Sequence, residues 1–402
     1  MTKRLYEDDV MQRSCRAVVT ACVPRKKGYG VVLDQTVFFP EGGGQLSDVG
    51  TLQAADRRWT VTHTAEADGE VYHEVDEAIP VGTQVEAVLD WQRRMDNMQQ
   101  HCGEHLVSFA FWKLFGAHNI GFHMNPELVT IDLDKELTWE QAMEAERLAN
   151  QHIEDDRPVT IQIVTPEQAA EMHLRKFNDK ITGPVRIIAI EGSDTCTCCG
   201  THPTTTGQIG LVKIFKARQH RGGTRLTMLA GRLALDRIRS EMEAATQASN
   251  LLSVKEEELP DAVGRMQDER TTLHQQLSER TQALAAYRVA ELRRHPVFDD
   301  EGHQRITLFE EAMEPGEAKF LMRQIESIPN AIAILLYHHG ERLNYMVEVT
   351  EGAEADASNL IRTLNDRFHG HGGGKKRNAQ GSAPYEEATA KDVQAFLQEK
   401  RA

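Results

Sequence analysis

The spacing of apolar residues changes near residue 90, from short alternating runs to longer helical periods. Before that point, short strands bounded by turn-forming residues are predicted at 15–23, 29–34, 59–62 and 84–89. Short strands at such regular spacing indicate a small β-barrel. After it, residues 91–118 have a broad apolar face that extends nearly all round, which is typical of a buried helix.

Between residues 119 and 231 the pattern alternates between strand and helix periods. Thr138 and Gln141 have the spacing of a capping box, which marks the start of a helix. A hairpin with a basic turn is expected at 221–231. The alternation indicates an α+β layer. Strands are predicted at 128–133, 159–164 and 185–190, and helices at 138–156 and from 165.

Residues 232–294 have a helical pattern, which is interrupted near Pro260. Beyond the proline, apolar residues fill six of eight a and d heptad positions, and Arg270 and Arg280 fill the other two. This pattern fits a dimerisation device and an amphipathic spacer equally well. The apolar positions are Val263, Met266, Leu273, Leu277, Leu284 and Tyr287.

The last hundred residues read as a separate α+β unit, with strands at 305–309, 331–337 and 343–349 and helices between and after them. The fold class predicted for the whole chain is therefore α+β. We expect four parts: a barrel-like domain at 1–90, an α+β core at 91–231, a helical or coiled-coil connector at 232–295 and a C-terminal α+β domain at 296–402.

Charge is unevenly distributed along the chain. The net charge of −15 gives no indication of a nucleic-acid-binding protein, yet residues 213–239 contain eight Lys or Arg and one acid. A glycine cluster at 370–374 precedes Lys375, Lys376 and Arg377, which is typical of a phosphate-binding loop or of a solvated linker. No apolar run has the length of a signal peptide or a membrane span, so we expect a cytoplasmic protein.

Four residues in two short stretches have the spacing of metal ligands. His101 and His105 are four apart, and Cys198 and His202 repeat that spacing. Residues four apart share one face of a helix, and three imidazoles with one thiolate would complete a tetrahedral zinc set. Cys196 and Cys199 are spare cysteines that could substitute. We expect one zinc ion per chain, in a structural or a catalytic role; four protein ligands normally close a structural site.

Two further features lie near these stretches. Glu104 sits between the two histidines, but helix geometry is expected to turn it off their face. Three consecutive glycines, from Gly42 to Gly44, follow Thr36 and precede Gln45. They would let backbone amides approach a ligand closely, or form a flexible hairpin turn.

Taken in order, these motifs resemble the editing domain of alanyl-tRNA synthetase and the free-standing AlaX-type trans-editing proteins. The matching elements are the stretch from Thr36 through Gly42-Gly43-Gly44-Gln45 to Gly50, the His101 and His105 pair, and Cys198 to His202 running into Gly207-x-Ile209-Gly210. The cluster at 370–374 is similar to that of the synthetase's C-terminal domain. The residue after Cys198 is commonly glycine in the synthetases and is Cys199 here.

The resemblance implies a zinc-dependent hydrolase that deacylates mischarged Ser-tRNA(Ala), and Gly-tRNA(Ala) as a further substrate. The chain begins directly with the editing barrel, so we expect it to act in trans. Thr36 and Gln45 would bind the serine hydroxyl and position the ester. Cations of the basic stretch would contact the acceptor stem, and Lys375, Lys376 and Arg377 another part of tRNA(Ala). The cations assigned to the acceptor stem are Lys213, Lys216, Arg218, Arg221 and Arg225.

Other interpretations fit the same motifs. The editing domain of threonyl-tRNA synthetase shares both metal half-motifs, so Ser-tRNA(Thr) is an alternative substrate. A non-catalytic tRNA-binding protein with structural zinc is a second alternative. A homodimer formed through the connector or the C-terminal domain is compatible with the heptad pattern.

Overall fold

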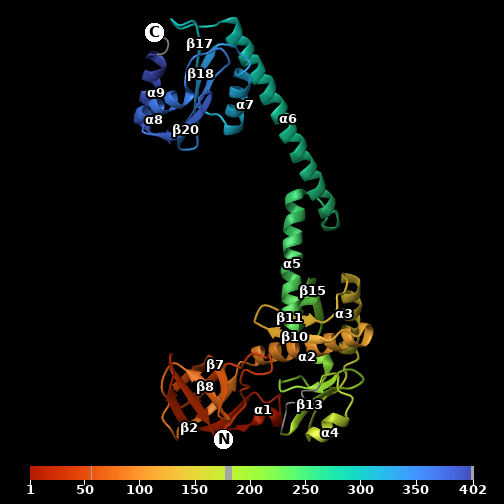
Figure 1. Ribbon diagram of the computed structural model, residues 1–402. Coiled ribbons are helices and arrows are strands. Elements are labelled where there is room, and N and C mark those ends of the chain that lie inside the picture. The colour runs from red at the N-terminus through yellow and green to blue at the C-terminus, as the bar shows by residue number, and fades with distance from the viewer. Residues whose placement is uncertain (56, 177–182, 400–402) are drawn as a thin grey trace. The chain divides into compact units, whose positions relative to one another are not determined.

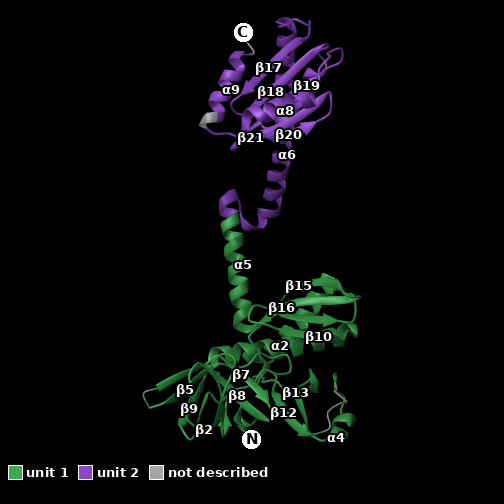
Figure 2. Ribbon diagram, turned by 60° about the vertical axis from the view of Figure 1, so that its left-hand side comes forward, with its two compact units in different colours: residues 1–248 green, residues 249–402 purple. Residues whose placement is uncertain are grey.

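A computed structural model describes residues 1–55, 57–176 and 183–399 and has the predicted α+β composition (Figure 1). The chain divides into two compact units, residues 1–248 and 249–402 (Figure 2). None of the described helices is both long and apolar enough to cross a membrane.

The first unit begins with a seven-stranded sheet whose strand order is β6-β5-β9-β2-β3-β8-β7. Neighbouring strands are antiparallel throughout. Only Thr62 separates β6 from β7, and its backbone N–H donates to the carbonyl oxygen of Glu74 in β8 at 3.0 Å. The chain therefore passes directly from pairing with β5 to pairing with β8, around one apolar core, as the predicted small barrel requires. The strands are β2 (Ser14–Pro24), β3 (Tyr29–Leu33), β5 (Gly50–Ala54), β6 (Arg57–Val61), β7 (His63–Ala67), β8 (Glu70–Val75) and β9 (Gln84–Leu89), preceded by β1 (Lys3–Arg4), which pairs with β4 (Gln35–Thr36), and α1 (Leu5–Asp8).

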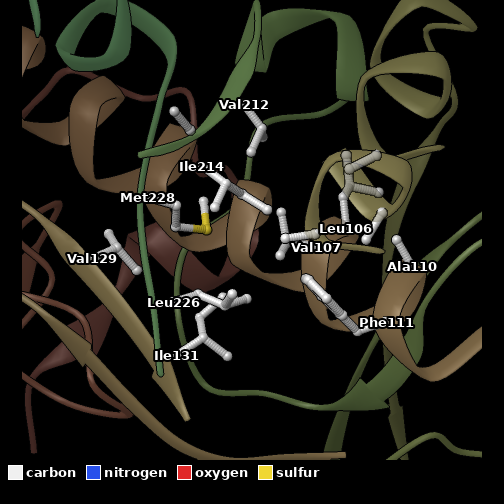
Figure 3. Packing of buried hydrophobic residues seen from close by; sticks show 14 of the residues in the cluster. Leu106, Val107, Ala110, Phe111, Val129, Ile131, Val212, Ile214, Leu226 and Met228 are labelled. Atoms are coloured by element: carbon white, nitrogen blue, oxygen red, sulfur yellow. The ribbon is translucent and has the colours of Figure 1, made fainter. Parts of the chain in front are cut away.

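The central helix α2 (Trp91–Phe115) follows the sheet and is buried over most of its length, as the sequence predicts. Asp90 caps its start by accepting from the backbone N–H of Arg93, and Gly116 ends it with a positive φ of 59°. The helix packs with α3 (Trp139–Glu154) against a second antiparallel sheet (Figure 3). That sheet has the order β10 (Asn119–Met124), β11 (Val129–Leu133), β16 (Gly223–Ala230), β15 (Val212–His220).

A small third sheet completes the unit and leads into the cysteine cluster. Its order is β12 (Val159–Val164), β13 (Val185–Ile190), β14 (Thr195–Thr197), with α4 (Pro166–Glu171) after β12. Beyond it, η1 (Thr206–Ile209) leads to the hairpin of β15 and β16. Arg221 and Gly222 form the predicted turn of this hairpin, and both have positive φ, which matches the twist of the flanking strands.

A buried ion pair joins the segment that contains the glycine motif, residues 36–50, to α2. Arg94 and Asp48 are both fully buried. The Arg94 guanidinium donates to Asp48 Oδ2 and also to the carbonyl oxygens of Val10 and Val37, at 3.0 and 2.6 Å. Because a buried charge without a partner is costly, this ion pair fixes the segment beside the helix.

The connector is helical, and its interruption, residues 253–258, lies just before Pro260 as predicted. Helix α5 (Gly231–Leu252) ends just before Ser253, which has a positive φ of 54°. Then η2 (Glu256–Glu258) leads into α6 (Leu259–Arg294), and Pro260 lies in the first turn of α6. Proline is tolerated there because the first-turn N–H groups have no partner within the helix.

The second unit contains a five-stranded sheet with helices on both faces. Alternate residues of β18 face opposite cores: Ile332 and Ile334 pack with α8 and α9, whereas Ala333 and Leu335 pack with α6 and α7. The sheet order is β17 (Gln304–Glu310), β18 (Ala331–His339), β19 (Arg342–Val349), β21 (Asn378–Pro384), β20 (His371–Gly374), and the helices are α7 (Pro315–Ile325), α8 (Ala357–Phe368) and α9 (Glu387–Glu399).

Candidate metal centre

The structure brings together the four residues that the sequence singles out. One ligand atom each from His101, His105, Cys198 and His202 lies within 4.8 Å of the others. The Cys198 Sγ is 3.3 Å from His101 Nε2 and 3.4 Å from His202 Nε2. The three imidazoles are 1–3% exposed. The histidine pair comes from α2, and the other two residues come from the loop after β14.

The loop can approach α2 this closely only because residue 200 is glycine. A Cβ on Gly200 would lie 2.2 Å from His101 Cε1 and 2.8 Å from Gln45 Oε1. Such distances are far below van der Waals contact, so any side chain here would displace the ligand or the loop. The Cys-x-Gly-Thr-His spacing therefore combines two ligands with the close approach that they require.

Gln45 orients the His101 imidazole through a hydrogen bond at Nδ1. Its Oε1 lies 2.9 Å from His101 Nδ1 and accepts from the backbone N–H of Thr201 at 2.9 Å. Its Nε2 donates to Thr201 Oγ1 at 2.7 Å. With Nδ1 of His101 engaged as a donor, Nε2 carries the lone pair and faces Cys198. Gln45 is 1% exposed, so its side chain supports the ligands from outside the cavity described below.

Asp194 plays the same part for His105. Its Oδ2 lies 2.9 Å from His105 Nδ1, and Arg175 binds both carboxylate oxygens at 2.7 Å. Burial alone would raise the pKa of Asp194, but the hydrogen bonds from Arg175 and His105 hold it well below its ordinary value. Cys196 Sγ lies 3.4 Å from His105 Nδ1. Because the guanidinium occupies the carboxylate, this second cluster of His105, Asp194 and Cys196 supports the first and is no cation site of its own.

The donor set fits a zinc ion. Burial would raise the pKa of the Cys198 thiol, but the neighbouring His101 and His202 hold it well below the ordinary value, which favours the thiolate. Burial also lowers the pKa of His202 to about 3, which keeps this imidazole neutral. Thiolate and neutral imidazole are the forms that bind zinc, and three nitrogens with one sulfur match its tetrahedral preference.

A cavity of about 380 Å³ opens onto three of these ligands, His101, His105 and Cys198. Its wall carries the cationic side chains of Arg175, Lys176 and Arg186, and Glu104 is the one acid among its described lining residues. The sequence predicts that Glu104 points away from the face of α2 that carries His101 and His105. The structure instead places Glu104 on the same cavity wall as these two histidines. Cys199 also lines the cavity, on the side where Gly43 approaches it.

The glycine motif forms a tight turn against this cavity. The backbone amides of Gly42 and Gln45 bond to each other's carbonyl oxygens at 3.2 and 2.9 Å. A Cβ on Gly44, whose φ is +83°, would lie 2.6 Å from the Phe122 ring. The glycines therefore make a hairpin turn, and Gly44 permits the close approach of Phe122; the approach of their backbone amides to a ligand stays a prediction.

Thr36 is not brought to this cavity. It is fully buried in the first sheet region, where its Oγ1 lies 2.8 Å from His73 Nε2 and accepts from the backbone N–H of Phe38 at 3.0 Å. His73 in turn bonds through Nδ1 to the carbonyl oxygen of Val31 at 2.9 Å. The expected contact of Thr36 with a serine hydroxyl has no support in this geometry.

The predicted tRNA-binding cations differ in their pairing. Lys213 bonds to Glu146 at 2.8 Å and Arg225 binds Asp132 at 2.6 and 2.7 Å, so both stabilise the fold. Three others, Lys216, Arg218 and Arg221, are exposed and have no ion-pair partner within the described ranges. In the second unit, Lys375, Lys376 and Arg377 are exposed between β20 and β21.

Sequence reasoning missed the residues that surround the ligands. An acid four residues before Cys198 was the available signal for Asp194. Arg175 and Lys176 come from an irregular segment after α4, and no local pattern marks them.

Comparisons with known proteins agree with the order of these motifs. Residues 6–93 match the family model "tRNA synthetases class II (A)", and residues 185–227 match "Threonyl and Alanyl tRNA synthetase second additional domain". The chain is 27% identical over 412 residues to the alanyl-tRNA editing protein Aarsd1 of Rattus norvegicus, covering 98% of this chain and 97% of that protein. The chain is a relative of the alanyl-tRNA editing proteins.

Two further editing-system relatives extend this relationship. The editing protein AlaX-L of Pyrococcus horikoshii is 26% identical, with 95% of this chain and 94% of that protein covered. An alanine–tRNA ligase of Pyrococcus abyssi is 28% identical over 94% of this chain, which spans 42% of the ligase. The chain thus spans less than half of that ligase and nearly all of the two editing proteins.

The solved structures that match include the C-Ala domain of Aquifex aeolicus alanyl-tRNA synthetase. It is 21% identical, with a TM-score of 0.22, over 25% of this chain and 93% of that domain. The AlaX-type resemblance drawn from the motifs is confirmed by the editing-protein relatives.

Proposed function

We propose that this chain is a zinc-dependent hydrolase that deacylates mischarged Ser-tRNA(Ala), with Gly-tRNA(Ala) as a second substrate. Its relationship to the alanyl-tRNA editing proteins assigns it to the aminoacyl-tRNA deacylases. One observation carries the zinc-dependent part: three histidines and a cysteine converge, and His101, His105 and Cys198 open onto a cavity of about 380 Å³ that is lined with cations.

The need for such an activity follows from the size of the amino acids. Serine is alanine with one additional hydroxyl, and a small apolar pocket cannot strongly reject that addition. A second site that hydrolyses the wrong ester then restores accuracy. Relatives that are themselves editing proteins match this chain over 94–97% of their length, which supports action on tRNA charged by a separate enzyme.

The protein's own groups hold and orient the reacting parts. A bound zinc would polarise the ester or a water molecule as a Lewis acid. His101, His105, Cys198 and His202 would hold the ion, because they supply its preferred donors, and the lowered pKa values of Cys198 and His202 favour the ligating forms of these two residues. Gln45 and Asp194 fix the two α2 imidazoles, so that Nε2 of each is directed away from its supporting partner.

Cations in three places suit the tRNA. Lys176 and Arg186 line the cavity and would attract the phosphates of the 3′-terminal nucleotides. The exposed Lys216, Arg218 and Arg221 would contact the acceptor stem, whereas Lys213 and Arg225 are already paired with acids. In the second unit, the exposed triad of Lys375, Lys376 and Arg377 would bind another part of tRNA(Ala).

A deacylation panel tests the proposal. The purified protein is incubated with Ser-, Gly- and Ala-charged tRNA(Ala) and with Ser-tRNA(Thr), before and after zinc removal by a chelator. We expect rapid hydrolysis of Ser-tRNA(Ala), much slower hydrolysis of Ala-tRNA(Ala), and loss of activity on chelation that added zinc reverses. Equal hydrolysis of the Ala and Ser esters would exclude proofreading, and preference for Ser-tRNA(Thr) would reassign the tRNA.

A further inference from the structure

Glu104 stands out among the groups that line the cavity. The other charged lining residues in the described ranges are Arg175, Lys176 and Arg186, all cationic. Glu104 is 5% exposed and directly precedes the ligand His105 on α2. It is absent from the four-residue ligand set, so its position on the cavity wall is not explained by metal binding.

One oxygen of Glu104 is held in place and the other is unpaired. Asn119 Nδ2 donates to Oε1 at 2.7 Å, and the Ser108 hydroxyl donates to the same oxygen. Asn119 also donates to Ser108 Oγ at 3.0 Å, which locks the three side chains together. In the described part of the chain, Oε2 has no hydrogen-bond partner. Because Glu104 lines the cavity, a ligand bound there can supply the donor that this carboxylate oxygen lacks.

An aminoacyl-tRNA supplies that donor beside the ester that is hydrolysed. Its α-amino group is attached to the carbon next to the scissile carbonyl, and its phosphates lie on the nucleotide side. We propose that Glu104 binds this α-amino group through Oε2, and thereby makes the site selective for esters of α-amino acids. This inference rests on the proposed deacylase function.

The charged residues that line the cavity match both the amino acid and the phosphates of an aminoacyl-tRNA. An acid suits the amino group in either protonation state, because both carry N–H donors and the protonated one is cationic. Lys176 and Arg186 suit the phosphates. Arg175 is neutralised by Asp194, so it does not compete with the substrate for Glu104. Other residues must recognise the side chain that distinguishes serine from alanine, because Glu104 contacts a group that all α-amino acids share.

A pair of esters that differ only at the α position tests the inference. Ser-tRNA(Ala) is compared with its deaminated product, in which a hydroxyl replaces the amino group. For the wild type we expect kcat/KM to be at least about tenfold higher for the amino ester, as for the loss of one charge-assisted hydrogen bond. In Glu104→Gln this preference should fall to about twofold, through a loss confined to the amino ester.

Lys176→Ala is the matched control on the same cavity wall. It should lower kcat/KM for both esters by the same factor, because the phosphates are common to them. A binding assay avoids turnover: the Kd of the non-hydrolysable 3′-serylamino-3′-deoxyadenosine is measured by calorimetry, with its deaminated analogue alongside. Zinc content is measured for every variant. We expect Glu104→Gln to keep its zinc and to lose the preference for the amino compound.

Two results would overturn the inference. The wild type could hydrolyse both esters equally, which decides the question even if Glu104→Gln does not fold. Alternatively, Glu104→Gln could slow both esters equally and lose zinc, which would make Glu104 a support of the metal site. In both cases the deacylase function would stand, since Ser-tRNA(Ala) is still hydrolysed by the wild type. Absence of hydrolysis by the wild type would instead overturn the proposed function itself, and the inference with it.

Discussion

Gln45 makes three hydrogen bonds behind the metal centre, one to His101 and two to Thr201. We expect Gln45→Ala to weaken zinc binding by about 10- to 100-fold, because outer partners of a metal-bound histidine fix its orientation and tautomer. Zinc affinity is measured by competition with a chromophoric chelator. Activity should fall at limiting zinc and recover at saturating zinc.

Thr36→Val is the matched control, since it lies in the same sequence motif. Its hydroxyl bonds to His73 and to the backbone of Phe38, away from the cavity. We expect unchanged zinc affinity and a loss of about 1 kcal/mol in the free energy of unfolding. If Gln45→Ala kept full zinc affinity and lowered kcat alone, Gln45 would have to contact the substrate directly.

His73 makes the stability of the first unit depend on pH. Burial lowers its pKa to about 4, against an ordinary value of 6.5. The unfolded chain therefore binds more protons between these values, so stability falls as the pH drops from about 6.5 to 4. The full effect is about 3 kcal/mol at most. Urea unfolding between pH 7 and pH 4.5 measures it, and His73→Gln should flatten this part of the pH dependence. An unchanged slope in that variant would assign the effect to other groups.

The sequence could single out the four candidate ligands that the fold brings together, because each pair is local. Spacings of four residues place His101 beside His105, and Cys198 at the same interval from His202, without knowledge of the fold. The supporting residues could not be placed in this way. Gln45 reaches the centre from 56 residues before His101, and Asp194 reaches His105 from 89 residues away. Only the tertiary fold brings such residues together.

At the scale of elements, α2 lies close to its sheet because Gly103 has no side chain. A Cβ there would lie 2.8 Å from the Ala230 Cβ and 3.1 Å from Val212 Cγ2. Alanine in a helix is ordinarily more stable than glycine by about 1 kcal/mol. Here crowding should reverse the sign, and we expect Gly103→Ala to destabilise the first unit by about 1–3 kcal/mol.

Gly264 in α6 is the control for this change. A Cβ at Gly264 would meet no atom within 4 Å, so Gly264→Ala should stabilise by about 0.5–1 kcal/mol. Both variants are measured by denaturant unfolding against the wild type. Stabilisation by Gly103→Ala would show that the helix can move away from the sheet at little cost.

Periodicity predicted most elements, but not the residue at which the backbone leaves the helical conformation. The strand at 185–190 and the strand at 159–164 agree with β13 and β12 residue by residue. The break in the connector was predicted near Pro260; it begins at Ser253, which adopts a positive φ, and ends where α6 starts at Leu259. Proline is easily recognised in a sequence, whereas a left-handed serine has no such signal.

At the scale of the whole molecule, the sequence indicated α+β parts joined by helices, and the described structure has this composition. The boundary predicted between residues 90 and 91 lies inside the first compact unit. Bonds from Asp48 to Arg94 and from Gln45 to Thr201 connect the two sides of that boundary. The metal centre therefore needs both predicted parts, because Gln45 and His101 come from opposite sides.

The a and d positions of α6 predict self-association. The six apolar residues of this seam, from Val263 to Tyr287, are 38–62% exposed. Burying Leu273 and Leu277 in a second copy would stabilise a coiled-coil dimer, while Arg270 and Arg280 limit its strength. We expect a concentration-dependent dimer in light scattering coupled to size exclusion. The double change Leu273→Glu and Leu277→Glu should raise its Kd by about a hundredfold or more, about 3 kcal/mol. Gln282→Glu, which adds charge on the opposite face, should leave the dimer unchanged. A wild type that stays monomeric at every concentration would instead make α6 an amphipathic spacer.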